Sequence, residues 1–323
     1  MKAAVIYKFG DTPRYEEFPD PVPSQGDSII SVKAVVLENF DKVTVAGTHY
    51  ASKAQYPVFP AIVGHNGVGV LEDGTLVAFG GTKPPYGTMA EKAVVPQKFS
   101  MFMSKVPQDI APEIAAAVLS TALVSFLPLK YGVKLQAGET VLINGASGAS
   151  GRVAVQVAKK LGAGKIIGTG RNEEALKALS KLGVDVTINT SQSDEDLAKA
   201  FTGAAPKGYD IVLDFLWGNP AEVFLRTLVP KEASLVAHRI RFVQIGESAG
   251  PTISLPAEAV RTSGLELLGA SNIPPEAVPD ALKEIWKWVE AGDLQIDIKK
   301  VPLSSIAEAW KEKTDGKRLV IIP

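Results

Sequence analysis

The chain has 323 residues, of which 46% are hydrophobic and 21% are charged, and its formal net charge is −1. This length exceeds what one hydrophobic core usually supports, so we expect two domains. Because there is no excess of basic residues, the composition indicates neither a nucleic acid nor an anionic membrane surface as a partner. The chain has no cysteine, which excludes disulfides, thiol nucleophiles and cysteine-ligated zinc sites.

The amino-terminal stretch MKAAVIYKFGDTPRYEEF lacks the long apolar core of a signal peptide. Elsewhere, no apolar run approaches the roughly 20 residues that a membrane-spanning helix needs. We therefore expect a soluble, cytoplasmic protein with no membrane partner.

The amino-terminal third has the pattern of a β-rich domain. Lys2–Tyr7 and Ser28–Val36 are rich in valine and isoleucine, and the PDPVPSQGD segment between them is typical of turns. Glycine-rich runs follow at Gly64–Gly69 and Gly80–Gly87, and Met89–Pro96 resumes a strand pattern.

From about Ala111 onward, short apolar strands alternate with helices. Alternation with buried apolar strands predicts an α/β fold with a doubly wound parallel sheet, covered by helices on both faces. The expected strands are Thr140–Ile143, Lys165–Gly168, Val186–Ile188, Ile211–Asp214, Arg241–Ile245 and Glu266–Gly269. The expected helices are Gly151–Leu161, Glu173–Leu182, Asp194–Phe201 and Ala221–Leu228.

The carboxy-terminal tail returns to a mixed pattern. Helices are expected near Glu276–Glu290 and Ser305–Lys313, and strands near Ile296–Val301 and at Arg318–Ile322. We infer that the first domain is discontinuous, formed by residues 1–113 and 275–323, and that the α/β domain, residues 114–274, is inserted between its pieces.

The stretch NGASGASGRVAVQVAKKLGA, which begins at Asn144, joins an expected strand to an expected helix. A strand, a glycine turn and a helix in this order are the context of a dinucleotide-binding fingerprint. We expect Gly148 to give the tight turn and to let backbone N–H groups approach a pyrophosphate, and Gly151 to let the helix pack close to the strand. The alternative is a plain glycine-rich turn.

The end of the second strand of the α/β domain indicates which dinucleotide is bound. An NAD site usually carries an acidic residue about 20 residues after the glycine turn, to bind the ribose hydroxyls. Here Gly170, Arg171 and Asn172 stand at that place, and the acids come later. An arginine would attract the 2′-phosphate of NADPH, with roughly ten- to hundred-fold preference over NADH. The alternative for Arg171 is a solvated residue that precedes a helix.

The order of these pieces resembles the medium-chain dehydrogenase/reductase superfamily, in particular its zinc-free, quinone oxidoreductase-like branch. The resemblance covers essentially the whole chain and is most specific in ETVLINGASGASGRVAVQVAKKLGA. The segments AVVLENFD, VGHNGVGVL, YGTMAEKAVVP and DGKRLVIIP also resemble motifs of that family. Val124, the pair Glu38 and Asn39, and the bulky DFLWGNP segment depart from the family pattern, which puts cofactor-ring contacts and substrate shape in doubt.

The resemblance implies a GroES-like, partly open β-barrel domain with a Rossmann domain inserted in it, and an active site in the cleft between the two. It also implies NADPH as coenzyme and a homodimer formed through edge strands of the Rossmann sheets, here Glu266–Gly269. The coenzyme-binding residues that we expect are Gly145, Ser147, Gly148, Ala149, Ser150, Gly151, Gly170, Arg171, Asn172, Asn189, Leu216, Trp217, Ile245, Gly246 and Glu247.

His65 occupies a position that resembles a zinc ligand of the metal-dependent branch. Catalytic zinc needs three protein ligands; Glu38 and Asp41 could join His65, but their spacing does not support a site. We expect no metal, and a hydrogen-bonded His65.

Without a metal as Lewis acid, the substrate should already be electrophilic: a quinone, or a carbon–carbon double bond conjugated to a carbonyl group. Tyr50 is the candidate that would stabilise the developing oxyanion or relay a proton, with a surface tyrosine as the alternative. His49 is a weaker catalytic candidate, and Asp41 is expected to fix its loop by hydrogen bonding more than to act as an acid. Two other functions stay open: an enoyl-thioester reductase and a non-catalytic NADPH-binding redox sensor.

Overall fold

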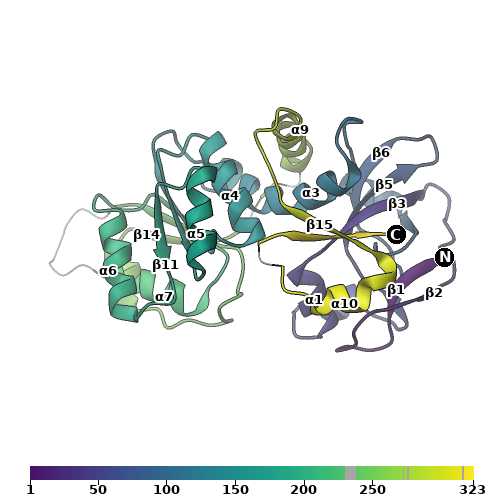
Figure 1. The fold of residues 1–323 in the computed structure, drawn as a ribbon, viewed down its shortest axis with the longest axis horizontal. Helices are drawn as coiled ribbons and strands as arrows, with labels where there is room; N and C mark the ends of the chain where they lie inside the picture. Colours follow the sequence, from purple (N-terminus) through teal and green to yellow (C-terminus); the bar gives the residue numbers. More distant parts are fainter. Residues whose placement is uncertain (230–237, 272, 275, 315) are drawn as a thin grey trace. The chain divides into compact units, whose positions relative to one another are not determined.

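The computed structural model of the protein describes residues 1–229, 238–271, 273–274, 276–314 and 316–323. The chain divides into two compact units (Figure 1). Unit 1 comprises Met1–Ser120, Trp286–Gly292 and Ile296–Pro323, and unit 2 comprises Thr121–Ile285 and Asp293–Gln295. Residue 275, at which we expect the second piece of the first domain to begin, lies outside the described residues.

Unit 1 is built on two sheets whose described pairings are antiparallel, apart from the parallel pair β15–β16. Its strands are β1 (Lys2–Ile6), β2 (Arg14–Glu17), β3 (Ser28–Leu37), β4 (Ala61–Ile62), β5 (Asn66–Leu71), β6 (Leu76–Gly80), β7 (Lys92–Val95), β8 (Ser104–Lys105), β15 (Ile298–Pro302) and β16 (Arg318–Ile322). The described strands form a small sheet in the order β2-β1-β4 and a larger one in the order β15-β16-β3-β5-β6-β8, with β7 also paired to β3. The glycine-rich run after residue 64 is therefore a strand inside the larger sheet.

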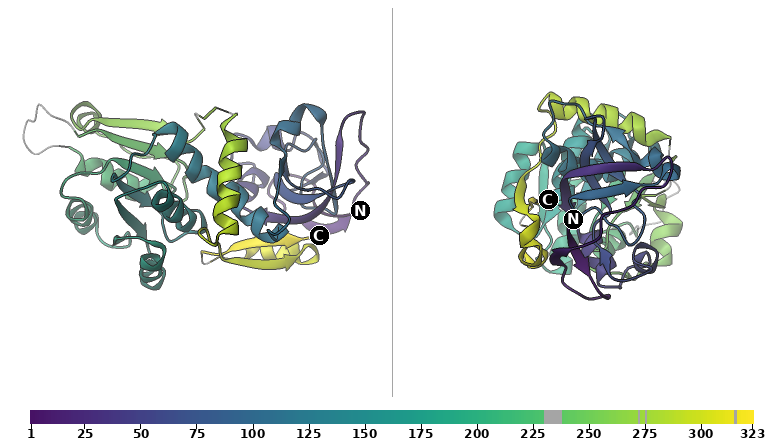
Figure 2. Two further views of the ribbon diagram at one scale, coloured as in Figure 1. Left: turned by 90° about the horizontal axis from the view of Figure 1, so that it is seen from above. Right: turned by 90° about the vertical axis from the view of Figure 1, so that its right-hand side faces the viewer.

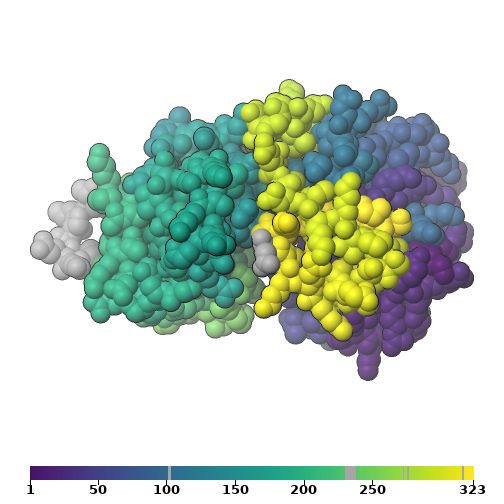
Figure 3. All heavy atoms as spheres, viewed as in Figure 1, coloured from purple at the N-terminus to yellow at the C-terminus, as the bar shows by residue number. Residues whose placement is uncertain are grey.

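The long strand β3 organises the core of unit 1. It pairs with β5, β7 and β16, so that segments from both ends of the chain meet on it. Both chain ends lie close together in this unit (Figures 1 and 2), and the closing segment 296–323 lies at the surface seen in Figure 3. The helices are α1 (Asn39–Val45), α2 (Ser52–Gln55), η1 (Gln97–Phe102), η4 (Leu303–Ser305) and α10 (Ile306–Lys311).

Unit 2 contains the parallel sheet that the strand–helix alternation predicts. Its strands are β9 (Thr140–Asn144), β10 (Lys165–Gly170), β11 (Val186–Asn189), β12 (Ile211–Asp214), β13 (Ile240–Gln244) and β14 (Leu265–Gly269). They are ordered β11-β10-β9-β12-β13-β14, and every described pairing among them is parallel. The helices are α4 (Ala149–Lys160), α5 (Glu173–Leu179), η3 (Ser180–Leu182), α6 (Asp194–Ala204), α7 (Gly218–Thr227) and α8 (Ala257–Thr262).

Helices cover both faces of this sheet. Leu142 of β9 belongs to a buried cluster with Phe201 of α6 and Phe224 of α7, so these two helices cover one face. Side chains alternate between the faces along a strand. The neighbouring Val141 and Ile143, fully buried but outside that cluster, therefore face the side of α4, which contacts β9. The doubly wound α/β fold is confirmed.

Two helices cross the division between the units: α3 (Pro112–Leu127), which continues into the π-helical turn η2 (Pro128–Gly132), and α9 (Ala277–Glu290). The stretch Pro112–Gly132 is long and apolar enough to span a membrane, contrary to our expectation that no run approaches that length. Within the protein, however, 61% of its most apolar window is buried, which is ordinary for the core helix of a folded protein.

Candidate active site and coenzyme-binding turn

The glycine turn between β9 and α4 is shaped by two glycines. Gly145 has a φ of 96°, in the left-handed region that other residues rarely adopt. Gly148 has an ordinary φ of −74° and closes the turn by donating its N–H to the carbonyl oxygen of Gly145 at 3.2 Å, so the left-handed conformation in this turn belongs to Gly145. A Cβ atom on Gly151 would lie 2.2 Å from the carbonyl oxygen of Gly145, so only glycine fits there. Gly151 therefore lets the helix pack closely on the turn that follows β9; its packing against the strand itself stays a prediction.

The amino terminus of α4 has the features of an anion site. Gly148 is its N-cap residue and gives no side-chain cap to the first turn, which comprises Ala149, Ser150 and Gly151. N–H groups at a helix amino terminus, together with the helix dipole, favour phosphate. Ser147 precedes the cap, and its N–H donates to the carbonyl oxygen of Thr169 on β10 at 3.3 Å.

The ends of β10 and β11 bring together a second group of the expected coenzyme residues. Gly170 is directly paired with Asn189 in the sheet, and a Cβ atom on Gly170 would lie 2.5 Å from the hydroxyl oxygen of Ser147. Asn172 caps α5 by accepting the N–H of Ala175 at 2.9 Å. Arg171, between Gly170 and Asn172, is exposed. The glycine turn and Arg171 therefore come from neighbouring strand ends.

The remaining expected coenzyme residues lie at the ends of β12 and β13. Ile245 and Gly246 follow β13, and both of their N–H groups donate to the main-chain carbonyl of Asp214, at 2.8 and 3.1 Å. Trp217 has φ 54° and ψ −152°, a conformation close to one that is essentially restricted to glycine and costs on the order of 1–3 kcal/mol. Its ring packs edge-on against Phe242, with the ring centroids 6.1 Å apart.

Asp214, at the end of β12, is a site residue that our sequence reasoning missed. Its side chain is fully buried, and it accepts hydrogen bonds from the side-chain amide of Asn144 and from the N–H groups of Leu216 and Trp217. Burial raises the pKa of this carboxyl to about 6, although these three donors oppose the rise. The sequence signal that could have identified Asp214 is its place at the end of the apolar run IVLD, because a charged side chain in a buried strand is rare unless it has partners.

In unit 1, a second polar cluster consists of the buried Asp41 and the partly buried Glu38 and His65. The Nδ1 atom of His65 lies 2.8 Å from Asp41 Oδ1, and its Nε2 atom lies 3.2 Å from Glu38 Oε2. Asp41 also accepts the N–H of Glu38 at 2.8 Å, within a capping box that begins α1. The expectations that His65 is hydrogen-bonded and that Asp41 fixes its loop by hydrogen bonding are therefore confirmed.

The charges of this cluster compensate one another. Burial alone would lower the pKa of His65, but the charges of Asp41 and Glu38 and the hydrogen bonds that the imidazolium donates to both carboxylates raise it to about 10. Burial alone would raise the pKa of Glu38, but the hydrogen bond and charge of His65, the charge of Arg318 and the Ser120 hydroxyl together lower it to about 2. At neutral pH the imidazolium and the Glu38 carboxylate are both ionised.

A series of rings leads from this cluster to the surface of unit 1. The ring of Phe40 lies edge-on to His65, with the centroids 4.6 Å apart, and edge-on to His49 at 5.2 Å. The rings of His49 and Tyr50 are 4.1 Å apart, and Tyr50 is 95% exposed. The structure thus groups Tyr50, His49 and Asp41 on α1 and the loop after it.

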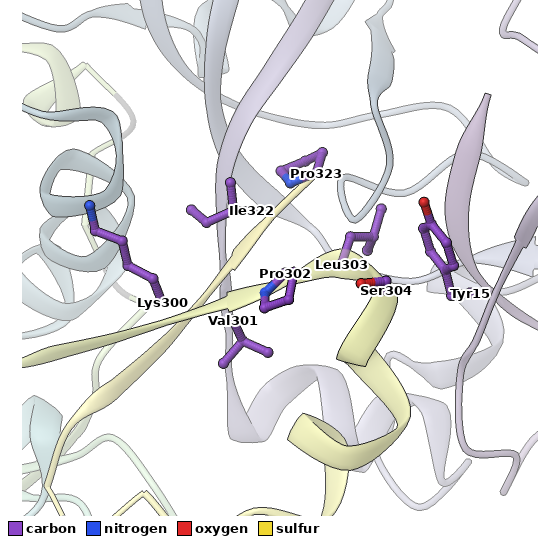
Figure 4. Close-up of a pocket in the computed structure, with 8 residues that line it drawn as sticks. All are labelled: Tyr15, Lys300, Val301, Pro302, Leu303, Ser304, Ile322 and Pro323. Atoms are coloured by element: carbon purple, nitrogen blue, oxygen red, sulfur yellow. The ribbon is translucent and has the colours of Figure 1, made fainter.

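Two cavities lie within the separate units. One, of about 370 Å³ in unit 1, is lined by the closing segment and Tyr15, and by none of the expected site residues (Figure 4). The other, of about 410 Å³ in unit 2, is lined by Trp217, Gln244 and Glu247, with Pro251 and Leu267–Gly269. The second cavity therefore adjoins two of the expected coenzyme residues.

The described residues contain no group of three or more His, Asp or Glu side chains placed to hold a metal ion. The two ring nitrogens of His65 contact the carboxylates of Asp41 and Glu38 directly.

Comparison with known proteins places this geometry in a family. Residues 149–287 match the sequence model of a family described as zinc-binding dehydrogenase. A 2-haloacrylate reductase of Burkholderia sp. is 30% identical over 279 aligned positions, which cover 80% of this chain and 81% of that protein. A probable NADPH-dependent quinone reductase of Emericella nidulans is 25% identical and covers 100% of both chains. The solved quinone oxidoreductase of Escherichia coli, complexed with NADPH, has a TM-score of 0.83 at 20% identity and covers 100% of both chains.

The fold and these matches define a member of the medium-chain dehydrogenase/reductase superfamily. The chain belongs to the zinc-free, quinone oxidoreductase-like branch of that superfamily.

Proposed function

We propose that the protein is an NADPH-dependent oxidoreductase that reduces quinones or α,β-unsaturated carbonyl compounds. The observation that carries the proposal is the glycine turn: Gly145 has a left-handed φ, Gly151 leaves no room for a Cβ atom, and the helix amino terminus at this turn has no side-chain cap. Relatives named quinone reductase and 2-haloacrylate reductase support the same reaction class.

The coenzyme-binding residues fit a dinucleotide. The N–H groups at the start of α4 would hold the pyrophosphate, and Ser147, Ser150 and Asn189 offer polar side chains near it. Leu216, Trp217, Ile245, Gly246 and Glu247 lie at the carboxyl ends of β12 and β13, where open α/β sheets bind ligands. When bound, NADPH supplies a hydride from its nicotinamide ring.

Arg171 would select NADPH over NADH. Its exposed guanidinium follows Gly170 at the end of β10, and the first acids after it, Glu173 and Glu174, belong to α5. A guanidinium matches the geometry of a phosphate group with two parallel hydrogen bonds. An acidic side chain at the strand end would repel the 2′-phosphate, and none is present there.

In unit 1, Tyr50 would donate a hydrogen bond to the oxygen that becomes negative as the substrate is reduced. Its hydroxyl is exposed and its ring rests on His49, which is the second candidate for proton transfer. Asp41 would act indirectly, by fixing α1 and the loop that carries both residues. Tyr50→Phe should then lower kcat by about 10²-fold and leave the Kd of NADPH unchanged.

The proposal is tested by oxidation of NADPH and NADH with a panel of quinones, enals and crotonyl thioesters, before and after treatment with a chelator. We expect NADPH oxidation with quinones or enals that survives chelation. Activity that vanishes on chelation and returns with zinc would contradict the metal-free mechanism. A response to thioesters alone would indicate the enoyl-thioester reductase, and coenzyme binding with no turnover would indicate the redox sensor.

We also propose a cytoplasmic homodimer, joined through the edge strand β14. Leu267 on this strand is 47% exposed, which suits an apolar contact at a sheet edge. Light scattering during gel filtration should give twice the mass of the chain, and Leu267→Lys should shift the protein toward the monomer.

A further inference from the structure

Asp214 is buried in unit 2 at the point where three neighbouring strands end. Its carboxylate lies 2.8 Å from the side-chain nitrogen of Asn144, 3.1 Å from the N–H of Leu216, and 3.0 Å from the N–H of Trp217. It therefore joins the end of β9 to the loop that follows β12. The Trp217 N–H that it holds belongs to the residue with the strained backbone described above.

The same hydrogen-bonded chain continues into the glycine turn. Asn144 Oδ1 accepts the hydroxyl of Thr169 at 2.7 Å, and the Thr169 hydroxyl oxygen accepts the N–H of Gly145 at 2.8 Å. Thr169 and Asn144 are as buried as Asp214, so water does not replace these contacts. The first glycine of the turn and the strained tryptophan are thus linked through three buried side chains.

The main chain of Asp214 reaches the third loop. Its carbonyl oxygen accepts the N–H groups of Ile245 and Gly246 after β13. A Cβ atom on Gly246 would lie 2.7 Å from the carbonyl oxygen of Phe215, so the second and third loops pack without space between them. Asp214 consequently contacts both of the loops, after β12 and after β13, that carry expected coenzyme residues.

Stability does not account for a carboxylate here. No ion pair joins Asp214 in the described part of the chain, and no charged side chain contributes to the shift of its pKa. The groups that face it are the amide of Asn144 and the two N–H groups of its own loop. Burial of an unpaired charge costs free energy of folding, and the raised pKa is the measure of that cost.

We propose that Asp214 is a positioning residue that holds the three loops after β9, β12 and β13 in the arrangement that binds NADPH. This inference rests on the proposed function and extends it to a residue that does not itself touch the coenzyme. The carboxylate holds Trp217 in its strained conformation. Through Asn144 and Thr169 it also fixes the position of the glycine turn relative to the loop that carries Trp217.

The test compares Asp214→Asn with Asp210→Asn. Asp210 is the control, because it directly precedes the same strand and its carboxylate also accepts a main-chain N–H, that of Thr140 on β9 at 2.7 Å; in addition it pairs with His238 at 3.1 Å. We expect Asp214→Asn to raise the Kd of NADPH at least tenfold and Asp210→Asn to change it less than threefold. In the coenzyme-free protein, hydrogen exchange at residues 215–218 should accelerate in the first variant alone.

The pH dependence of binding separates positioning from a purely structural role. With NADH, which carries no 2′-phosphate to titrate, the wild-type Kd should rise as the pH falls below about 6, because Asp214 then binds a proton. This rise should be absent in Asp214→Asn. If Asp214→Asn does not fold, Thr169→Val removes the hydroxyl that links Gly145 to Asn144 and should raise the Kd of NADPH about threefold to tenfold.

Failure of this inference is distinguishable from failure of the proposed function. If the wild-type protein does not bind NADPH, the proposed function fails and this inference fails with it. If the wild-type protein binds NADPH and folded Asp214→Asn binds it within threefold as tightly, with unchanged exchange at residues 215–218, only the role of Asp214 is overturned.

Discussion

The two units solve the problem of buried charge in opposite ways. In unit 1, His65 lies between two carboxylates, so that positive and negative charges compensate one another. In unit 2, the Asp214 carboxylate is surrounded by uncharged donors. The consequences are visible in the pKa values: Glu38 falls to about 2 and His65 rises to about 10, whereas Asp214 rises to about 6.

This difference distinguishes the structural cluster around His65 from Asp214, whose pKa lies close to neutral pH. Glu38 and His65 stay ionised between their pKa values of about 2 and about 10, so their ion pair can hold α1 and the loop that carries Tyr50 in one conformation at neutral pH. Asp214 changes its charge within two pH units of neutrality, and strongly perturbed titratable groups are enriched at functional sites. Removing one partner should therefore damage stability in unit 1 and coenzyme binding in unit 2.

The largest effect is expected from His65→Ala, which removes the positive charge that lies between the two carboxylates. Loss of one member of a buried pair costs roughly 3–5 kcal/mol, and the partial exposure of His65 places this variant near about 3 kcal/mol. Urea unfolding followed by circular dichroism measures the free energy of unfolding. His238→Ala is the control, because that histidine pairs with Asp210 but is 46% exposed and should contribute less than about 1 kcal/mol. Equal losses of unfolding free energy in the two variants would contradict the claim that the His65 cluster is a major source of stability in unit 1.

The pH dependence of stability should show two separate windows, with a size of about 1.4 kcal/mol per unit of pKa shift before screening. Both His65 and Asp214 have raised pKa values in the folded protein, so each contributes stability at low pH that is lost as the pH rises. For Asp214 the loss falls between about pH 4 and 6, and for His65 between about pH 6.5 and 10. Asp214→Asn should remove only the first loss and His65→Gln only the second, as measured by unfolding across pH 4–10. If stability were lost over one pH range that both substitutions removed, the claim that His65 and Asp214 titrate independently would be contradicted.

Glycine substitutions in the turn of unit 2 should have the next largest effect. Gly151→Ala would place a methyl group against the carbonyl oxygen of Gly145, so α4 must move. We expect this to lower the free energy of unfolding by about 1–3 kcal/mol and to raise the Kd of NADPH at least tenfold. Gly148→Ala is the matched control, because the nearest atom to its Cβ is that same oxygen at 3.5 Å. Thermal unfolding and coenzyme titration of both variants check this, and equal tolerance would show that the turn is looser than the structure indicates.

The smallest effects should come from removing one hydroxyl group from each cluster. Ser120→Ala removes the hydroxyl that donates to Glu38 and should cost about 1 kcal/mol of stability with no change in coenzyme binding. Thr169→Val should cost about as much stability but should also weaken NADPH. Parallel measurements of unfolding and of coenzyme Kd distinguish the two variants. A loss of coenzyme binding in Ser120→Ala would contradict the claim that the His65 cluster of unit 1 affects stability but not coenzyme binding.

The sequence predicts the sheet of unit 2 well because its signals are local. The strand ends at Asp214 and Gly269 agree with the structure, and the close contact of Gly151 follows from the fingerprint itself. The role of Gly145 was not predictable, because the motif does not say which glycine takes the left-handed conformation. Asp214 escaped notice because its partners, Asn144 and Trp217, come from different segments and only the fold brings them together.

The cluster of unit 1 illustrates a second limit of the sequence. Glu38 and Asp41 are close in the sequence, and their capping box follows from local rules. His65 joins them only because β5 begins beside α1, and this pairing of charges depends on long-range contacts. The contacts with the two carboxylates, which raise the pKa of His65 to about 10 against the opposing effect of burial, are likewise a property of the folded unit.

The central claim is that unit 2 binds NADPH through the amino terminus of α4 and Arg171. The most direct measurement is the Kd of NADPH and of NADH for the wild-type protein and for Arg171→Ala. The account predicts that the variant loses about ten- to hundred-fold in affinity for NADPH and little for NADH, because only NADPH carries the 2′-phosphate. Equal losses for both coenzymes, or wild-type protein that binds neither, would contradict it.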